Sequence, residues 1–530
     1  MKNLFAAGLV LLFAMGVVGG TTYYLDAVNG SDTNDGSSAK PWKSMNKAKV
    51  ALQPGDVVYL RTGNYGAVEF TSKTQLGSSA GYKTYRADPA TCAPRPADWW
   101  TVPMAKSTNG KAVFSSLSLY TSPKQYLHFE GITINGGGFI VSDLASHLVL
   151  KDLDLFGPGQ EGTAFYFRQR TGATTMFNDI TVEGCYLTEY SRGIFQMGTT
   201  GANLVFKGNH LYKLTGSAIS MRSGTANAPI LIEGNHVHTY IHTDGAHASG
   251  LSIRRGNLII RGNVVHNFGS TATLFTYDCS NENTVVENNL FYDPRNTSNS
   301  TKFTGIANNF TCRNNTFIGR DIGKSYGYEY MVGLSIGGPA AGTDLTTITI
   351  ANNIVVGRLG APLELGSRVR NNIAFWADAS LAANNIIKTD REYWEGSGTF
   401  FKGSALFDQY AFKSIGGATH DKTMNDAFQL ATGSPAIGYA DAGEATAADI
   451  VGFTRDNDPD AGAYEYTTTG LHPEIPNPMY QIPTQTHLGW LNKGVYLITG
   501  KYVGNVSRAN NTGVYLVNED GMLNKVVVTR

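Results

Sequence analysis

Charged side chains make up only 16% of this 530-residue chain, and the 42 basic and 42 acidic residues cancel. A net charge of zero argues against a nucleic-acid or polyanion binder that works through bulk attraction. Cysteine is also scarce, and no CxxC or other zinc-like spacing occurs. The cysteines permit disulfides outside the cell, but their irregular spacing predicts no pairing. They are Cys92, Cys185, Cys279 and Cys312.

Long apolar runs are absent after the N-terminus. The start, MKNLFAAGLVLLFAMGVVGG, has a lysine, an apolar run from Leu4 to Val18 and then small residues. This pattern predicts a secretory signal peptide over residues 1–20. The run is too short for a membrane span. We therefore expect a protein that is secreted or held at the cell surface.

Glycine and asparagine are abundant, and they mark an internal repeat. The segments LVFKGNHLYKL, ILIEGNHVHTY, LIIRGNVVHNF, TVVENNLFYDP, FTCRNNTFIGR and ITIANNIVVGR share a short β-rich run, then Gly-Asn or Asn-Asn, then a second apolar alternation. The first four intervals between copies are 26, 28, 26 and 26 residues. Weaker copies are LHFEGITI, LVLKDLDL, ITVEGCYL, RVRNNIAF and LAANNIIK. The second residues of the six strong pairs are Asn209, Asn235, Asn263, Asn289, Asn315 and Asn353.

Such a period with several short strands per repeat predicts a parallel β-helix, an all-β solenoid. The asparagines have a physical role at the bends between strands. Their amides can bond nearby backbone groups, and stacked copies can bond one another from coil to coil.

The two ends of the repeat region resemble a known family. YYLDAVNGSDTNDGSSAKPWKSMNKAKVALQPGDVVYLRTGNY is similar to the N-terminal signature of secreted β-helix proteins, and DNDPDAGAYEY, Asp456 to Tyr466, resembles their closing segment. The chain thus resembles the right-handed parallel β-helix family, the fold of pectate lyases, from about Thr22 to Tyr466. The resemblance implies a solenoid with an N-terminal cap over residues 21–466 and a polysaccharide as substrate or ligand.

The composition changes after Tyr466. Residues 467–489 carry four prolines and predict an extended linker. Residues 490–530 predict a small β module. Their ending, GVYLVNEDGMLNKVVVTR, resembles the sorting domains of type IX secretion, which implies secretion machinery as a partner. The alternative is a β module that covers or attaches the protein.

Strand alternation assigns one column of rings to the outer surface. Residues two past each asparagine of the repeat are apolar and must point inward, so residues one and three past it point outward. We expect an exposed file of rings that suits a sugar-binding platform, or that merely stabilises the solenoid face. Its members are His210, Tyr212, His236, His238, His266 and Tyr292.

A second column carries arginines. SAISMRSG, SGLSIRRG and VGLSIGGP align as one strand, so Arg222 matches Arg254, and AFYFRQRTG places Arg168 at the same position. Stacked arginines need anions between them. These anions would be bound carboxylates or acidic residues of neighbouring coils.

The stretch HTYIHTDGAHASG contains an inserted loop, with six extra residues within Thr239 to Ser249. Two following coils lengthen at the same place, and insertions on one side of a solenoid usually mark its binding surface. A polysaccharide lyase for uronate-containing glycans would need carboxylate neutralisation, a base and an acid. The predicted groups are Arg222 and Arg254 for the carboxylate, His242 or His247 as base with Asp244 orienting it, and Tyr212, Tyr277 or Lys302 as acid.

Three alternatives stay open. One is a metal centre of His242, Asp244 and His247, completed by His238 or His210. Another is a glycoside hydrolase that uses Asp244 and Asp278, or Glu329. The third is a glycan-binding surface protein or adhesin without catalysis. No cofactor is certain, although the loop Asn29 to Gly36 would either hold calcium or form a capping turn.

Overall fold

The computed structural model describes residues 20–100, 103–120, 125–142, 146–159, 161–168, 177–197, 203–221, 229–241, 248–268, 271–294, 299–319, 332–389, 400–401, 428–467, 494–497, 502–504, 513–519 and 522–528. The predicted signal peptide lies outside them except for Gly20, as does nearly all of the predicted linker.

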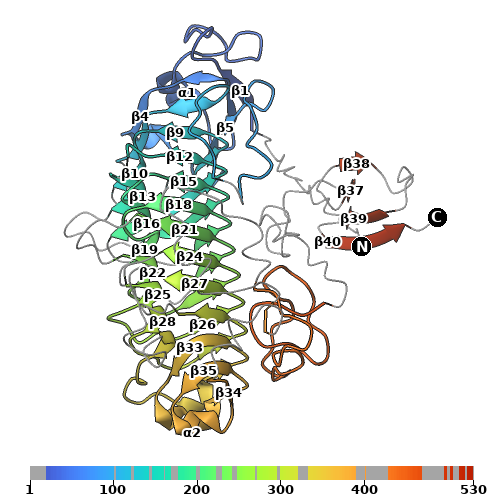
Figure 1. Cartoon of the computed structure of the whole chain (residues 1–530). Helices are drawn as coiled ribbons and strands as arrows, with labels where there is room; N and C mark the ends of the chain where they lie inside the picture. The colour runs from blue at the N-terminus through green and yellow to red at the C-terminus, as the bar shows by residue number, and fades with distance from the viewer. Residues whose placement is uncertain are drawn as a thin grey trace, which may run out of the picture.

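The chain winds into a right-handed parallel β-helix whose coils stack into a long column (Figure 1). Each full coil supplies one strand to each of three rows, and every row is parallel. Row 1 is a 13-stranded sheet. Its strands are β1 (Thr22–Leu25), β2 (Val57–Leu60), β5 (Lys83–Ala87), β8 (Leu127–Glu130), β11 (Ser146–Lys151), β14 (Asn178–Glu183), β17 (Leu204–Lys207), β20 (Ile230–Glu233), β23 (Leu258–Arg261), β26 (Thr284–Glu287), β29 (Phe310–Arg313), β32 (Thr349–Ala351) and β34 (Val369–Arg370).

Rows 2 and 3 form a 23-stranded sheet because they join at β33 (Ile354–Gly360). The other strands of row 2 are β3 (Gly63–Asn64), β6 (Ala112–Phe114), β9 (Thr133–Asn135), β12 (Asp154–Phe156), β15 (Tyr186–Thr188), β18 (His210–Leu214), β21 (His236–Tyr240), β24 (Val264–Phe268), β27 (Leu290–Pro294), β30 (Thr316–Ile318), β35 (Ile373–Ala377) and β36 (Ile386–Ile387). Those of row 3 are β4 (Ala67–Phe70), β7 (Ser116–Leu119), β10 (Phe139–Ser142), β13 (Thr163–Arg168), β16 (Arg192–Met197), β19 (Ile219–Met221), β22 (Ser249–Ile253), β25 (Ala272–Thr276), β28 (Asn299–Phe303) and β31 (Val332–Ile336).

The bend between rows 1 and 2 explains the Gly-Asn and Asn-Asn pairs. The first residue of each pair has a positive φ, for example 60° at Gly234 and 52° at Asn288, a conformation that glycine and asparagine adopt most readily. The second residue is a buried asparagine. Its side chain accepts from the backbone N–H of the preceding copy and donates to a backbone carbonyl, as Asn235 does to Phe206 at 2.9 Å. This asparagine spine runs through Asn209, Asn235, Asn263, Asn289, Asn315, Asn353, Asn372 and Asn385.

The interior is apolar, as alternation predicts. The residues two past each spine asparagine are fully buried: Leu211, Val237, Val265, Phe291, Phe317 and Val355. Cys185 and Cys312 lie in the same core, and all four cysteines, each within the described residues, are free rather than paired.

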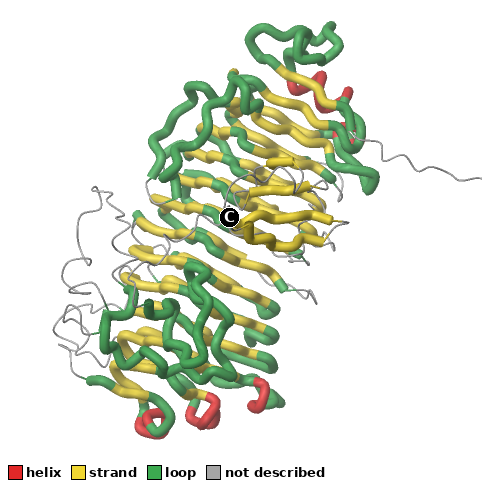
Figure 2. Tube along the Cα trace, turned by 90° about the vertical axis from the view of Figure 1, so that its right-hand side faces the viewer, coloured by secondary structure: helices red, strands yellow, loops and turns green. Residues whose placement is uncertain are grey.

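Helices lie near the two ends of the column (Figure 2). At the N-terminal end, helix α1 (Met45–Ala51) begins at Ser44, whose side chain accepts from the backbone N–H of Lys47. The carboxylate of Asp32 accepts from the backbone N–H groups of Lys43 and Ser44. The loop from Asn29 to Gly36 is therefore a capping turn. Within the described residues, the other helices are α2 (Ala379–Ala382) and short 3₁₀ turns at Lys73–Gln75, Leu345–Thr347 and Leu363–Arg368.

The predicted closing segment does not stop at the end of the column. Residues 428–467 run back along its side, where they pack on outer side chains of row 2 (Figure 1). Further on, β37 (Gly494–Leu497), β38 (Tyr502–Gly504), β39 (Gly513–Glu519) and β40 (Met522–Val528) form an antiparallel sheet in the order β38-β37-β39-β40. Among the residues described here, no helix has the length and apolar character needed to cross a bilayer.

Candidate functional site

The predicted file of rings on row 2 has the expected register. His210 pairs with His236 in the next coil, and Tyr212 pairs with His238. His238 pairs with His266, and His266 with Tyr292. All point away from the apolar interior, since the residues between them are the buried core positions. Imidazole and phenol rings separated by tens of residues thus stack along one flank.

The prediction that this file is exposed is wrong. His210 and His238 are 0% exposed, and His266 and Tyr292 are 2% exposed. A long connection between β5 and β6 crosses the flank and lays Trp99 and Trp100 over the histidines, with ring centroids 5.9 Å apart between Trp100 and His236. These rings therefore form no open sugar platform; of the predicted file, only Tyr212 is half-buried rather than buried.

The closing segment covers the next part of the same flank. The ring of Phe428 packs against Tyr292 with centroids 4.6 Å apart. Buried Ile450 and Tyr464 of the closing segment extend this contact over the outer side chains of the later coils. Phe400, which precedes the segment in the chain, packs in the same cluster. Two segments far apart in the sequence thus enclose one flank.

Four imidazoles, from His210, His236, His238 and His266, form the histidine cluster beneath the tryptophans. The Nε2 atoms of His210 and His238 lie 2.6 Å apart, and those of His236 and His266 lie 3.0 Å apart. Backbone carbonyls hold the far side of two rings: Nδ1 of His210 lies 2.8 Å from the oxygen of Trp99, and Nδ1 of His236 lies 3.1 Å from that of Trp100. A carbonyl only accepts, so both Nδ1 atoms carry the proton.

Burial favours the neutral form of His236. Loss of solvation lowers the pKa of His236 to about 4, despite the opposing effect of the Trp100 carbonyl. Next to it, Thr239 has a φ of 61°, which is rare for a β-branched residue, and its hydroxyl lies 3.0 Å from Nδ1 of His238. Lys213 and Asn267 have positive φ values at the same place in the neighbouring coils, so this conformation belongs to the bend of the coil.

A different set of predicted residues meets on row 3. Arg254 lies over the ring of Tyr277, with its guanidinium carbon 4.2 Å from the ring centre. Phe275 stacks beside Tyr277 at 4.9 Å and 11°, and the Lys302 ammonium lies 5.8 Å from the Phe275 ring. We call Arg254, Phe275, Tyr277 and Lys302 the cation–aromatic face. All four are half-buried, which leaves part of each in contact with solvent.

Arg254 already has an anionic partner within the chain. The carboxylate of Asp278 lies 3.1 Å from Arg254, and its side chain is 72% exposed. No carboxylate among the described residues pairs with Lys302. Arg254 therefore has an internal partner that an incoming anion must displace, whereas the described residues provide no such partner for the Lys302 ammonium.

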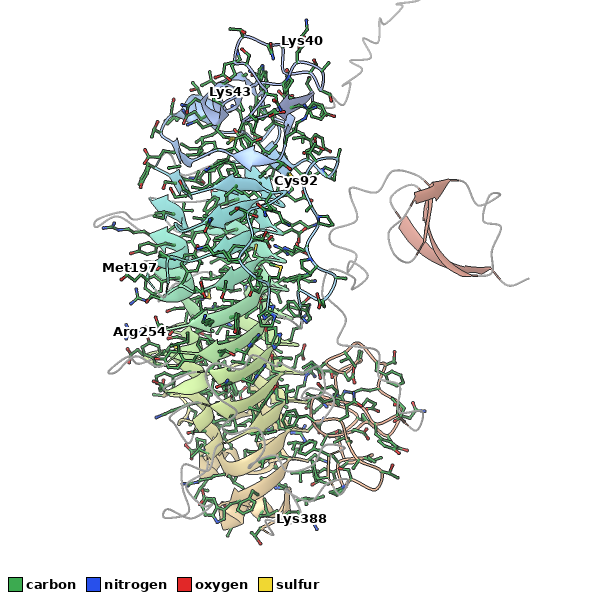
Figure 3. The ribbon with its side chains drawn as sticks, turned by 45° about the horizontal axis from the view of Figure 1, so that its top comes forward. Lys40, Lys43, Cys92, Met197, Arg254 and Lys388 are labelled. Carbon is green, nitrogen blue, oxygen red and sulfur yellow. The ribbon has the colours of Figure 1, made fainter. Side chains whose placement is uncertain are left out.

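The face continues along row 3 toward the N-terminus. Arg192 lies 4.4 Å over Phe195, and the hydroxyl of Tyr166 lies 3.4 Å from the sulfur of Met197, which is 41% exposed. Arg168 pairs in register with Met197 and is exposed. Figure 3 shows Met197 and Arg254 on one side of the column and Cys92, at the start of the connection that covers the histidines, on the other.

The predicted catalytic set is divided by this arrangement. Arg254 is the one member within the described residues, and it lies with Tyr277 and Lys302, not with the histidine file. His242, Asp244, His247 and Arg222 lie outside the described residues, as does Glu329. Their catalytic roles stay predictions.

Sequence reasoning missed three residues that shape the histidine cluster: Trp99, Trp100 and Thr239. The tryptophans had a local signal. Two adjacent indoles in PADWW, outside any alternating strand, carry too much apolar area for a solvent-exposed loop. They had to cover another apolar or aromatic surface. Thr239 carried no comparable signal.

No protein-family model matches the chain, and no curated protein matches it. Several solved structures are similar. Pectate lyase Pel9A has a TM-score of 0.41 and 14% identity, with 85% of this chain and 98% of that chain covered. The GH136 lacto-N-biosidase from Eubacterium ramulus has a TM-score of 0.39 and 14% identity, with 60% and 66% covered. A rhamnogalacturonan lyase has a TM-score of 0.29 and 15% identity, with 71% and 88% covered. The likeness is one of fold alone.

Proposed function

We propose that this protein is a secreted polysaccharide-active β-helix protein that holds a uronate-containing glycan along the cation–aromatic face and cleaves it by β-elimination. The observation that carries the proposal is the pair of stacked rings, Phe275 and Tyr277, with the Arg254 cation over the Tyr277 ring and the Lys302 cation over the Phe275 ring. Flat aromatic rings bind the apolar faces of sugars. Arginine and lysine bind carboxylates.

β-Elimination gives these groups distinct roles. Arg254 and Lys302 would neutralise the uronate carboxylate, which makes the neighbouring proton easier to remove. Tyr277 lies against Arg254, so its hydroxyl group would stand close to the carboxylate-bearing sugar. As a phenolate it would take the proton next to the carboxylate, and the phenol formed would give that proton to the leaving oxygen.

The inserted loop precedes β22, whereas Arg254 follows the end of that strand. Five residues of extended chain span roughly 17 Å. We therefore assign neither His242 nor His247 to the sugar that Arg254 holds, and their role as base stays a prediction from the sequence.

A glycan-binding role without catalysis is the second candidate. The ion pair between Arg254 and Asp278 favours it, because a guanidinium already neutralised is a weaker electrophile for elimination. Binding alone requires only the rings and the Lys302 charge.

The test compares polyuronates with neutral polysaccharides on the full-length protein. Elimination is followed by the absorbance of unsaturated products, and binding by calorimetry on the same samples. The variants are Arg254→Ala, Tyr277→Phe and Lys302→Ala. Arg358→Ala is the matched control, because Arg358 lies 4.6 Å over Trp376 and pairs with Asp378 in the same manner at another place.

Unsaturated product from the wild type that is lost in Arg254→Ala and Tyr277→Phe, but kept in Arg358→Ala, supports the lyase. Binding without product, weakened in Arg254→Ala and Lys302→Ala, supports the binding role instead. A wild-type protein that neither binds nor cleaves any polyuronate contradicts both.

A further inference from the structure

We propose that His210, His236 and His238 form a buried binding centre for a transition-metal ion such as Zn²⁺. One nitrogen from each ring lies within 4.8 Å of the others, and all three residues are buried. In the part of the chain that the structure describes, this is the one group of three such residues close enough to share an ion.

The hydrogen bonds on the far side of the rings match those of a metal site. Metal-binding histidines usually donate their second ring N–H to a carbonyl or carboxylate, which fixes the ring and directs the other nitrogen at the ion. The carbonyls of Trp99 and Trp100 do this for Nδ1 of His210 and His236. The Nε2 lone pairs of these two rings consequently point into the cluster.

Without an ion, the first pair of rings is held by one proton. His210 Nε2 carries none, so at 2.6 Å the proton belongs to Nε2 of His238, whose Nδ1 then accepts from the Thr239 hydroxyl. An ion at the centre takes the place of that proton. The proton moves to Nδ1 of His238, and the Thr239 hydroxyl rotates to accept it. The ion also takes the place of the Nε2 proton that His266 donates to His236; that proton stays on His266, so no net proton is released.

The geometry needs one pair of nitrogens to open slightly, and pairs up to 4.8 Å apart to close by up to roughly 1.5 Å. Zinc–nitrogen bonds of about 2.0–2.1 Å in a tetrahedral site separate ligand nitrogens by roughly 3.3 Å. The His210 and His238 nitrogens, now 2.6 Å apart, would move apart by less than ~1 Å. His266 lies beside the centre, with its ring stacked on His238 at 5.1 Å and its Nε2 3.0 Å from that of His236. It would become a fourth ligand if its Nε2 proton moved to its Nδ1.

The ligand types select the kind of ion. All of them are neutral imidazoles, which suit Zn²⁺, Cu²⁺, Ni²⁺ and Co²⁺, whereas Ca²⁺ and Mg²⁺ prefer oxygen ligands. The centre also differs from the one predicted from sequence around His242, Asp244 and His247. It uses two strands of row 2, β18 and β21, rather than the inserted loop.

The test measures ion binding directly and needs no polysaccharide. Full-length protein treated with a chelator is titrated with ZnCl₂ by calorimetry, and bound zinc is counted by elemental analysis after gel filtration. We expect one tightly bound equivalent. Replacing it with Co²⁺ should give the intense visible absorption of a four-coordinate cobalt site.

Variants separate the cluster from other histidines. His210→Ala and His236→Ala should weaken zinc binding by at least ~100-fold, whereas His242→Ala/His247→Ala and His147→Ala should bind as the wild type does. Circular dichroism checks that each variant keeps its β structure. A wild-type protein that retains no zinc overturns the proposal, since this result does not depend on any variant folding. Unchanged binding in a folded His236→Ala variant overturns it as well.

Discussion

The side-chain amide of Asn235 donates a hydrogen bond of 2.9 Å to Oδ1 of Asn263, which lies 28 residues later and one coil further along. The same oxygen accepts from the backbone N–H of Asn235 at 2.9 Å. Asn263 in turn donates to Asn289 and to the carbonyl of Ile232. One buried side chain thus fastens three consecutive coils.

Asn263→Ala should therefore destabilise the solenoid strongly. It leaves several buried N–H and C=O groups without partners, each at a cost of about 1–3 kcal/mol, so we expect a loss of about 3–5 kcal/mol in the free energy of unfolding. Urea denaturation measures it. Asn384→Ala, at an exposed position beside the end of the spine, should change stability by less than about 0.5 kcal/mol. Equal effects of the two substitutions would contradict the role of the spine.

Asp278→Asn should increase the affinity for polyuronates. The substitution removes the carboxylate 3.1 Å from Arg254 and keeps a residue that tolerates the positive φ of 53° at this position. Because the pair is exposed, the stability should change by less than about 1 kcal/mol. We expect the dissociation constant to fall several-fold, measured by calorimetry at low ionic strength. An unchanged constant would mean that Arg254 does not contact the glycan.

Glu465→Ala should detach the closing segment. Glu465 pairs with Arg455 at 2.8 Å, both side chains are 2–3% exposed, and its carboxylate also accepts from the backbone N–H of Asp460. Removing one partner of a buried ion pair costs about 3–5 kcal/mol. Limited proteolysis should then cleave within residues 428–467 well before the coils. Glu444→Ala, which breaks the more exposed pair with Arg370, serves as the control and should leave cleavage nearly unchanged.

Acid should weaken the folded state through His236. Its pKa falls from 6.5 to about 4 on folding, so between these pH values the unfolded chain binds more protons than the folded one. This contribution is fully present above pH 6.5 and is lost as the pH falls toward 4, by about 3 kcal/mol in total. The measurement compares chelator-treated wild type with His236→Gln by urea denaturation.

Because the wild type and His236→Gln share all other titrating groups, the contributions of those groups to the pH dependence cancel in the difference between the two proteins. His128 has its pKa lowered to about 4 by burial, whereas burial raises the pKa of Asp449 to about 6, and these groups are common to both proteins. The destabilisation caused by His236→Gln should shrink as the pH falls below 6.5. A difference that stays constant with pH would show that His236 titrates normally.

The sequence predicted features that depend on one coil and its neighbours. A positive φ at the bend favours glycine or asparagine, and the position after it favours an amide, so the repeat appears in the sequence as recurring Gly-Asn and Asn-Asn pairs. Alternation then assigned Leu211 and Val237 correctly to the interior. The column register of His210 over His236 follows from the same rule.

What covers the flank could not be predicted in this way. Trp99 reaches His210 across 111 residues, and Asn288 bonds Ala448 across 160. Nothing in a local pattern states over which row a long connection passes. A side chain that points away from the interior of a solenoid is therefore not always exposed to solvent. The four histidines point outward but are buried by the segments that cover them.

The asparagine spine also explains how this protein can carry coils of unequal length. Consecutive amides bond in the same way whether 38 residues separate them, as between Asn315 and Asn353, or only 13, as between Asn372 and Asn385. Because each spine asparagine fixes the position of the bend in its coil, the connection to the next asparagine can be long or short. A foreign loop grafted between two spine asparagines should therefore be accepted without disturbing the coils on either side.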